Sequence, residues 1–491
     1  MAVDELGFPL WIRLTHFFNF FFMLLLIRSG IEILGAHPKL YWNDDALPGS
    51  EWLRATKKQM PRNRLWTAED ETQPMPSWLA LPGQSNLGLG RHWHFWSVTG
   101  WLLTGLIYVV LLFTSPQWRR LIPTSWNIFS DAWQSFLIYL HFQIPPEGNP
   151  FNPIQQLTYF ALIFGLAPLQ IVTGIVMSPA LAGRFPWLLR IFGGRQAARS
   201  LHFLGMISFV IFIVIHLILV VCHGFGREMA KIVLGDEAHS HTRGLVVGLA
   251  VIGGVAVFHL WATGYSLRHR FKTKKLLEIG IDPLWKFLFH SWRSRQNYSR
   301  ISSFARVNGR PPQNETYQRM VADQFKDWRL EIRGLVHKPL NLSLDDLRQM
   351  PFQTQTTLHT CIQGWSYLAR WSGVPLSALL EKCQPLAKAR YLVFYTLDEK
   401  AEVPSHGWYY EVIDLAIAVQ PQTLLAYEMN GQPLPIPHGA PLRLRTESQL
   451  GYKMAKWINA IELVETFDRI GRGQGGWRDD LLNYYPSDAG I

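Results

Sequence analysis

The sequence predicts a multi-domain chain, in which an all-α bundle of five membrane spans precedes a soluble α+β domain. Of its 491 residues, 48% are hydrophobic and only 17% are charged, a charge fraction that is low for a soluble protein. Long apolar runs stop near residue 271, after which shorter runs alternate with charges and Pro/Gly turns. The 21 tryptophans suit the two interfaces of a membrane, where their amphipathic rings are enriched.

Five segments are long and apolar enough to cross a hydrocarbon layer of about 30 Å. They occupy residues 11–34, 93–114, 155–177, 201–222 and 244–265. Arg28 lies near the end of the first segment, from where its long side chain can reach the interface. The apolar segment 130–142 is short and ends before a proline pair, so we expect it to lie at the interface. The polar loop 35–90 is large enough to cap one membrane face.

The second half alternates between strand and helix patterns. RLEIRGLV alternates as a strand, and SLDDLRQM predicts a helix that begins after a Ser cap. RYLVFYT predicts a buried strand, VIDLAIAVQ a short helix, and PLRLRT and AIELVETF two more strands. We therefore expect a membrane domain over 1–270, a basic juxtamembrane linker over 271–304, a soluble domain over 305–468 and a C-terminal tail over 469–491.

Charge and cysteine usage narrow the class of protein. Nine Lys/Arg fall between Arg268 and Arg300, directly after the last span, where a cluster facing anionic membrane lipid is favoured over a nucleic-acid site. The three cysteines are odd in number and irregularly spaced, which argues against a disulfide framework. Cys222 and Cys383 fit small buried residues. Neither a cleavable signal peptide nor a twin-arginine signal is apparent.

Histidines inside the apolar segments point to a redox function. His202 and His216 are 14 residues apart in one span, so they share a helix face at depths about 21 Å apart. An ionisable residue at membrane depth is costly and is a functional candidate, although a lone histidine is as often a helix–helix hydrogen bond. Two histidines on one face suggest two stacked haems, each of which needs a second ligand from another helix.

The second ligands follow from depth. The candidates are His16 in the first span and His92 or His94 at the start of the second. Because consecutive spans run in opposite directions, His94 lies at the depth of His202, and His16 at that of His216. Two neutral imidazoles on one iron give a low-spin b-type haem suited to electron transfer.

The four segments that carry these histidines resemble the di-haem cytochrome b subunits of bacterial thiosulfate reductases, formate dehydrogenases and hydrogenases. The likeness covers about residues 10–265 and includes RLTHFFNF, RHWHFWSVTG, PIQQLTYFALIFGLAPLQ and GGRQAARSLHFLGM. It implies two b haems, exchange with the quinone pool, a multi-pass protein of the bacterial inner membrane, and His94 as the ligand in the second span, with His92 interfacial. His259 has no counterpart in that family, so helix packing is its default interpretation.

Three segments of the soluble half suggest a metal cofactor that carries phosphate. Cys361, in LHTCIQGWSYL, sits in a turn containing Gly and Trp after a strand-like run, where a thiolate can ligate a soft metal. Arg443, in HGAPLRL, offers a planar fork for phosphate. In GYKMAKW, Gly451 permits close backbone approach and Lys453 adds a charge. Each of these charges alone fits an ordinary surface residue.

Together the three segments resemble the sulfite oxidase fold that binds molybdenum–molybdopterin, and most closely the catalytic subunits of bacterial methionine sulfoxide reductases, over about 305–468. The resemblance implies that Cys361 ligates molybdenum. It implies contacts to the cofactor from Asn308, Thr396, His438, Arg443, Gly451 and Lys453. Gln363 stands where the reductases have a glutamate, and an amide cannot relay protons, so the proton donor is left open. His438 stands where they have asparagine.

These features predict a membrane oxidoreductase that passes electrons from quinol through two haems to molybdenum and reduces an S- or N-oxide. One alternative is a sulfite-type dehydrogenase that feeds electrons to quinone. Another is an electron-transfer or sensor protein without a metal in its soluble domain. No nucleic-acid partner is expected, and a homo-oligomer is left open.

Lys/Arg counts in the loops bear on orientation. The face with the loop 35–90, the loop 178–200 and the cluster after the fifth span carries the larger number, which places the soluble domain in the cytoplasm. The cytochrome family favours the opposite orientation, because its members usually begin inside and five spans then end outside. We expect the cytoplasmic arrangement.

Overall fold

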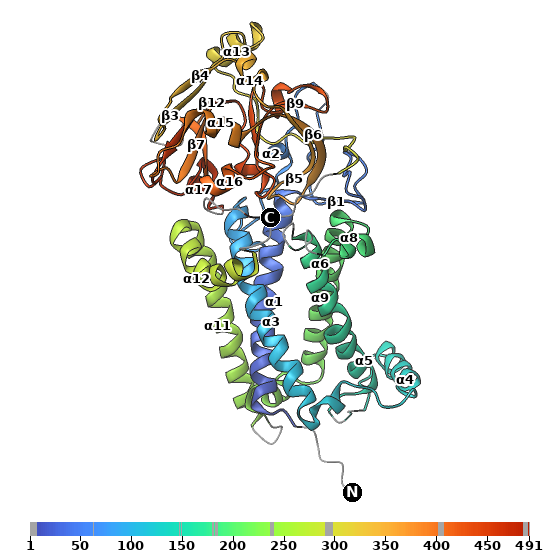
Figure 1. Cartoon of the computed structure of the whole chain (residues 1–491). Coiled ribbons are helices and arrows are strands. Elements are labelled where there is room, and N and C mark those ends of the chain that lie inside the picture. Colours follow the sequence, from blue (N-terminus) through green and yellow to red (C-terminus); the bar gives the residue numbers. More distant parts are fainter. Residues whose placement is uncertain are drawn as a thin grey trace.

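A computed structural model describes residues 7–61, 63–146, 148, 150–178, 181, 185–235, 240–289, 298–400, 407–484 and 490. The side chains of residues 186 and 282–289 are not part of this description. Figure 1 shows a helical bundle stacked against a half that contains the sheets. Among the basic residues of the orientation argument, Arg62, Arg184, Arg293 and Arg295 lie outside the described residues.

Five helices have the length and apolarity of membrane spans, which confirms the predicted fold class of the first half. A helix of 27 residues is about 40 Å long, so both ends pass beyond a hydrocarbon core of about 30 Å. The spans are α1 (Leu10–Ala36), α3 (Leu87–Phe113), α5 to α6 (Pro153–Met177), α9 (Arg195–Cys222) and α11 (His241–Arg268).

The third span is not a regular helix throughout. It begins at α5 (Pro153–Ala161) with a capping box on Asn152, passes through a π-helical turn, η2 (Leu162–Leu166), and continues as α6 (Ala167–Met177). Pro168 explains the π turn, because it lacks a backbone N–H and its ring pushes the preceding carbonyls aside.

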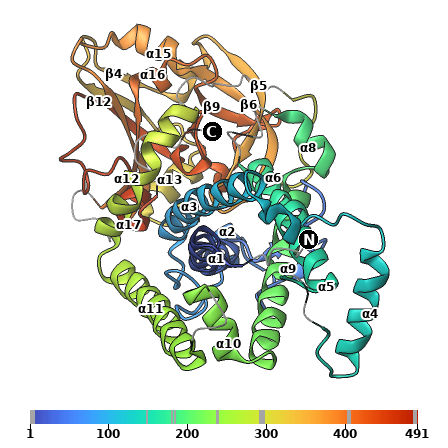
Figure 2. The ribbon, with the colours of Figure 1, turned by 90° about the horizontal axis from the view of Figure 1, so that it is seen from below.

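The helices pack in two neighbouring pairs, α1 with α3 and α6 with α9 (Figure 2). Between α9 and α11 the chain forms α10 (Phe225–Met229) and η3 (Ala230–Leu234), at the end of the bundle away from the sheets. At the same end lie η1 (Pro116–Arg120) and α4 (Ile128–Leu140). Helix α4 lies beside the bundle, and the interfacial position of segment 130–142 stays a prediction.

The loop between α1 and α3 lies at the opposite end, against the soluble half. It contains β1 (Lys39–Leu40), β2 (Leu53–Arg54) and the short helix α2 (Ala68–Glu71). The helix α8 (Pro186–Phe192) lies at this end as well. The spans therefore alternate so that α3 and α9 both begin next to the soluble half.

The described soluble half contains two five-stranded sheets. One has the order β4-β3-β12-β7-β8, in which β12 is parallel to β3 and the other pairs are antiparallel. Its strands are β3 (Leu330–Gly334), β4 (Leu340–Leu342), β7 (Tyr391–Glu399), β8 (Trp408–Asp414) and β12 (Ile458–Val464). The other is antiparallel, with the order β10-β9-β6-β5 and β11 also on β9. Its strands are β5 (Gln353–Thr360), β6 (Ser366–Pro375), β9 (Leu424–Met429), β10 (Gln432–Pro433) and β11 (Arg443–Arg445).

Most predicted elements of this half are confirmed. The Ser cap is present, because Ser343 forms a capping box at the start of α14 (Leu344–Arg348). The segment VIDLAIAVQ is only partly helical: β8 continues to Asp414, which then caps α16 (Leu415–Ala418). The largest core packs both sheets against these helices, α13 (Glu315–Ala322) and α15 (Leu376–Cys383), and includes Trp328 and Phe394.

Two segments expected to lie outside the domains are part of the fold. The linker begins as α12 (Arg270–Phe289), which packs on α3 and buries Leu277. The tail forms α17 (Trp477–Leu482), which contacts β8 and α3. Basic composition favoured a cluster that faces anionic lipid, but one face of α12, with Thr273, Leu277 and Ile281, is buried.

Candidate functional site

The structure brings the four membrane histidines together in the two expected pairs. The ring centres of His94 and His202 are 6.5 Å apart, and those of His16 and His216 are 6.4 Å apart. Two imidazoles on one iron have centres about 6 Å apart, given Fe–N bonds of about 2 Å and about 1.1 Å from nitrogen to ring centre. Both pairs therefore fit one haem iron each.

Hydrogen bonds orient the pair nearer the soluble half. Ser29 Oγ lies 3.0 Å from His94 Nδ1, and Thr173 Oγ1 lies 3.0 Å from His202 Nδ1. Each hydroxyl donates its single proton to a carbonyl of its own helix, at 2.7 Å. Each hydroxyl oxygen therefore accepts from Nδ1–H, which leaves the Nε2 lone pair of both rings free to bind iron.

Aromatic rings surround the other pair. Phe212 stacks on His216 with ring centres 5.5 Å apart, and Tyr159 meets the same imidazole edge-on at 6.4 Å. His259 lies outside both pairs, because Arg28 Nη1 donates to its Nδ1 at 3.0 Å. His92 also lies apart, since its Nε2 is 3.4 Å from Glu278 of α12.

Cys361 sits in a tight turn between β5 and β6. The turn closes through hydrogen bonds from Cys361 N to Trp365 O (3.0 Å) and from Gly364 N to Cys361 O (3.1 Å). Gly364 has φ +101°, a conformation that favours glycine. The thiol is buried, which raises its pKa to about 11, so only a nearby cation would make it a thiolate at neutral pH.

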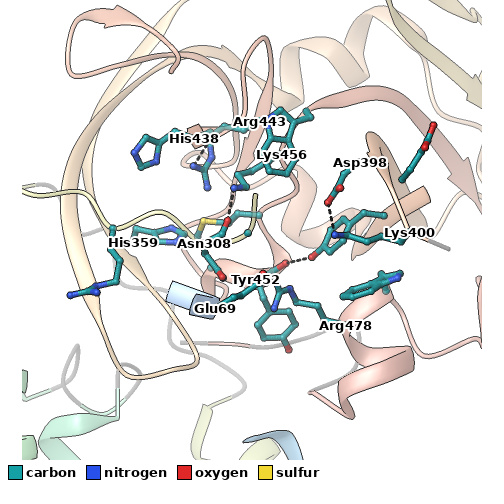
Figure 3. Close-up of a pocket in the computed structure, with 18 of the residues that line it drawn as sticks. Glu69, Asn308, His359, Asp398, Lys400, His438, Arg443, Tyr452, Lys456 and Arg478 are labelled. Atoms are coloured by element: carbon teal, nitrogen blue, oxygen red, sulfur yellow. Dashed lines mark hydrogen bonds and ion pairs between the residues drawn. The ribbon is translucent and has the colours of Figure 1, made fainter. Parts of the chain in front are cut away.

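A polar cavity of about 400 Å³ opens beside this turn. Figure 3 shows side chains converging on it from several segments of the chain. Basic side chains outnumber the acidic ones, Glu69, Asp398 and Glu399, in its lining. The basic residues are Arg306, His359, Lys400, His438, Arg443, Lys456 and Arg478. Such a cationic lining suits a cofactor that bears phosphate.

His359 lies near the end of β5, two residues before Cys361, and its neutral imidazole carries an N–H that can donate a hydrogen bond. Arg445 Nη1 donates to His359 Nδ1 at 2.7 Å, so the proton of the imidazole is on Nε2. Burial and the charges of Arg445 and Arg443 hold the pKa of His359 well below its usual range. Gly451 allows this placement, because a Cβ there would collide with the His359 ring. The sequence prediction did not include His359.

The predicted cofactor contacts fall into two groups. Asn308, His438, Arg443 and Gly451 line the cavity, and Asn308 Nδ2 is 4.0 Å from Cys361 Sγ. Arg443 has its guanidinium 4.7 Å above the Trp371 ring and donates to His438 O at 2.9 Å. Arg445 instead pairs with Glu447 at 2.8 Å, which leaves Arg443 as the charge available from β11.

The remaining predicted residues lie behind the cavity wall. Thr396 is buried and its hydroxyl donates to Tyr409 O at 2.8 Å. Lys453 is fully buried in an ion cluster and is absent from the described cavity lining, which includes Lys456 instead. Gln363 lies next to the metal-ligand candidate: its Oε1 is 3.6 Å from Cys361 Sγ and accepts from Trp365 Nε1 at 3.0 Å.

The two halves are joined directly at the Cys361 turn. Arg91 of α3 donates to Ile362 O at 3.4 Å, and Gln196 of α9 donates to Gly364 O at 2.9 Å. His94 lies three residues after Arg91, and His202 six residues after Gln196. The helices that carry the upper histidine pair therefore begin in contact with the candidate metal ligand.

The loop after α1 also reaches the cavity. Its Glu69 pairs with Arg478 of α17 at 2.6 Å, and both side chains line the cavity. Glu71 is fully buried and pairs with Lys39 at 3.2 Å and with Arg306 of the soluble half. Sequence patterns gave no sign of these residues, because their partners in the soluble half, Arg478 and Arg306, lie more than 200 positions away.

Comparison with known families covers both halves. Residues 7–235 match the family described as prokaryotic cytochrome b561, and residues 317–469 match the oxidoreductase molybdopterin binding domain. The chain is a fusion of these two units. The cytochrome unit contains all four paired histidines, and the molybdopterin domain contains Cys361 and Arg443 but ends before Arg478. The families indicate b-type haem and molybdopterin as the cofactors.

Curated relatives match parts of this fusion. A putative protein-methionine-sulfoxide reductase subunit YedZ1 of Azospira oryzae is 35% identical over 32% of this chain and 55% of its own length. The catalytic subunit MsrP of the protein-methionine-sulfoxide reductase of Xanthomonas axonopodis is 37% identical over 29% of this chain and 46% of its own length. The chain thus spans about half the length of the curated relatives it matches.

Among solved structures, the sulfane dehydrogenase SoxCD of Paracoccus pantotrophus aligns with 24% identity over 31% of this chain and 45% of that chain. The TM-score of this alignment is 0.25.

Proposed function

We propose that this protein is a membrane-bound molybdenum oxidoreductase that takes electrons from quinol, passes them through two b haems and reduces an S- or N-oxide. The observation that carries this proposal is the contact of α3 and α9 with the Cys361 turn. It connects a histidine pair that fits a haem to a buried cysteine beside a cationic cavity.

The haem ligands in this proposal are His94 with His202 near the soluble half, and His16 with His216 at the far end. Ser29 and Thr173 fix the tautomer of the first pair. Quinol would reduce the far haem, and electrons would move along the bundle toward the cavity. Haems transfer single electrons, and a molybdenum site can accumulate the two that oxygen-atom removal needs.

At the molybdenum site, Cys361 would supply the thiolate ligand. Arg443, Lys456 and His359 Nε2–H would hold the anionic pterin cofactor, together with Asn308 and His438. Bound molybdenum would supply the oxygen-atom transfer chemistry and favour the thiolate of Cys361. Gln363 would hold the Cys361 sulfur in place through its contact with Sγ. Thr396 would hold the backbone of Tyr409, a residue of the cavity wall, through its hydrogen bond to Tyr409 O.

The sulfoxide class of substrate is supported by the relatives, which are named as methionine-sulfoxide reductase subunits. The reverse reaction, oxidation of sulfite with electrons passed to quinone, is a second candidate, because the cationic cavity also suits a small anion. Reoxidation of reduced haem by sulfoxides would support the reductase direction, and reduction of oxidised haem by sulfite would support the reverse direction.

The same proposal places the molybdenum domain in the cytoplasm, because the membrane face next to it carries the greater number of Lys/Arg. Activity reporters fused to the C-terminus test this. A reporter that works only in the cytoplasm should be active at this position. Activity of a reporter that works only outside the cytoplasm would show the opposite orientation.

The main test is metal analysis followed by haem reoxidation. We expect one molybdenum and two haems per chain, and reoxidation of dithionite-reduced haem by sulfoxides or N-oxides. Cys361→Ser should abolish reoxidation, whereas Cys383→Ser, which changes a buried core thiol in α15, should not. Absence of molybdenum, or unchanged reoxidation in Cys361→Ser, would contradict the proposal.

A further inference from the structure

A second buried polar cluster lies directly behind the cavity wall. Lys453 Nζ is 3.0 Å from Glu411 Oε2 and 2.8 Å from Asp479 Oδ2, and it also donates to Gly475 O at 2.8 Å. The side chains of all three ionisable residues are fully buried. They come from β8, η5 (Gly451–Lys453) and α17.

Two carboxylates share one ammonium in this cluster. In a dry site such an arrangement favours one additional proton, because an uncompensated negative charge is costly there. Burial, opposed by Lys453 and reinforced by Asp479, raises the pKa of Glu411 above the usual range of a glutamate. Asp479 Oδ1 has no hydrogen-bond partner among the described residues. Lys274 of α12 faces Asp479, and Asp480 on the other side bonds Tyr410.

Tyr409 connects this cluster to the cavity. Its side chain lines the cavity, and its hydroxyl lies 2.7 Å from Glu411 Oε1 and 3.2 Å from the carbonyl oxygen of Tyr452. Burial and the Glu411 charge raise the pKa of Tyr409 well above its usual range, although Arg478 faces it, so the phenol stays protonated. A neutral hydroxyl between a carboxyl group and a cavity can pass a proton by accepting one and donating another.

Two other carboxylates at the cavity each pair with a cation of their own, and a third, Glu399, is exposed to solvent. Asp398 lies 3.3 Å from Lys400, and Glu69 lies 2.6 Å from Arg478. Gln363, next to Cys361, is an amide and cannot release a proton. The Glu411 cluster differs from these groups because two carboxylates share one ammonium there, and Tyr409 links it to the cavity.

We propose that the Glu411–Lys453–Asp479 cluster stores a proton that Tyr409 delivers to the cavity during each reduction. This inference rests on the proposed oxide reductase function. Reduction of a sulfoxide breaks its S–O bond and forms a thioether and water, which consumes two protons and two electrons. The electrons come from quinol through the haems. One proton leaves Tyr409 for the departing oxygen while Glu411 returns its own to the phenol oxygen. The second proton of the product water comes from solvent, and Glu411 is then reprotonated from water.

The test uses the full haem- and molybdenum-loaded protein and two adjacent tyrosines. Tyr409→Phe removes the relay hydroxyl, whereas Tyr410→Phe removes a hydroxyl that bonds the buried Asp480 on the other side of β8. Proton transfer by a positioned side chain contributes about a hundredfold or more to a rate. Water can replace part of this contribution, so we expect Tyr409→Phe to slow sulfoxide-driven haem reoxidation at least tenfold. It should also abolish the solvent deuterium isotope effect, while Tyr410→Phe keeps both.

Glu411→Gln provides the second arm. In the wild type the reoxidation rate should fall with rising pH as the stored proton is lost, and this alkaline limb should be absent in Glu411→Gln. Independently of activity, infrared difference spectra across that pH range should show a protonated carboxyl band that Glu411→Gln removes. Equal rates and pH profiles in Tyr409→Phe and Tyr410→Phe, or a band that persists in Glu411→Gln, would overturn the inference. A wild type without oxide reduction would instead reject the proposed function, since the infrared arm does not depend on turnover.

Discussion

Glu71 is the residue on which the contact between the loop after α1 and the soluble half depends. It accepts hydrogen bonds from His37 Nδ1 (3.2 Å), Trp66 Nε1 (2.9 Å) and Arg306, and it pairs with Lys39. Burial alone would raise the pKa of Glu71, but the hydrogen bond from His37 and the charge of Arg306 hold it well below its usual range. The carboxylate is therefore much more stable in the folded protein than in the unfolded chain.

Glu71→Gln should destabilise the protein by about 3–5 kcal/mol, because it leaves Lys39 and Arg306 buried without a counter-charge. Since the folded pKa is depressed, the contribution of Glu71 is fully present above the unfolded value of about 4.5 and is lost as the pH falls below it. Denaturant unfolding at several pH values measures both effects. Glu331→Gln, which breaks an exposed pair with Arg333, is the control, and an equal loss in the two variants would contradict this account.

Arg443 is the residue whose geometry matters most for phosphate. We expect Arg443→Ala to lose most of its molybdopterin, because a bidentate charge-assisted contact is removed. Arg443→Lys keeps the charge but not the planar fork, so it should retain the cofactor only partly. Molybdenum and pterin content of the purified variants measure this. Wild-type content in Arg443→Ala would show that the phosphate lies elsewhere.

Among elements, α1 and α6 act on haem ligands that they do not carry. Ser29 of α1 holds His94 of α3, and Thr173 of α6 holds His202 of α9. Each hydroxyl is one turn from the carbonyl that takes its proton, so the helix backbone itself fixes the tautomer of the neighbouring imidazole.

Ser29→Ala should weaken haem binding at the His94/His202 site by about 10–100-fold, the usual range for loss of a residue that orients a metal ligand. Thr104→Ala is the matched control, because Thr104 lies on α3 and its hydroxyl bonds Gly100 O in the same helix. Haem titration and the midpoint potential of each haem are the measurements. Equal effects of the two substitutions would mean that the Ser29 hydroxyl does not orient the ligand.

At the scale of the whole molecule, the contacts of α3 and α9 with the Cys361 turn couple the two halves. Gln196→Ala removes the hydrogen bond to Gly364 O and should slow electron transfer from haem to the cavity by about three- to tenfold, as expected for one lost hydrogen bond. Haem and molybdenum content should stay unchanged. Stopped-flow haem reoxidation measures the rate, with Gln156→Ala at the far end of the bundle as the control. No difference between the two would remove Gln196 from the path.

Local patterns in the sequence were enough to predict five spans and two histidine pairs at two depths. The length and apolarity of a span are properties of one segment, and depth follows from counting along helices that alternate in direction. Cys361 and Arg443 were likewise identified from short motifs. Arg443 lines the cavity and Cys361 lies next to Asn308 of its lining, and their binding of a cofactor stays a prediction.

Tertiary structure alone decided which side chains complete the cavity. The side chain of Lys453, the lysine of GYK, lies in the cluster with Glu411 and Asp479, while Lys456, three residues later, lines the cavity. Glu69 and Arg478 meet there although 409 positions separate them. The cost of burying a charge explains these positions, because a buried lysine needs carboxylates to compensate its charge. The carboxylates of Glu411 and Asp479 come from a strand and a helix that only folding brings together.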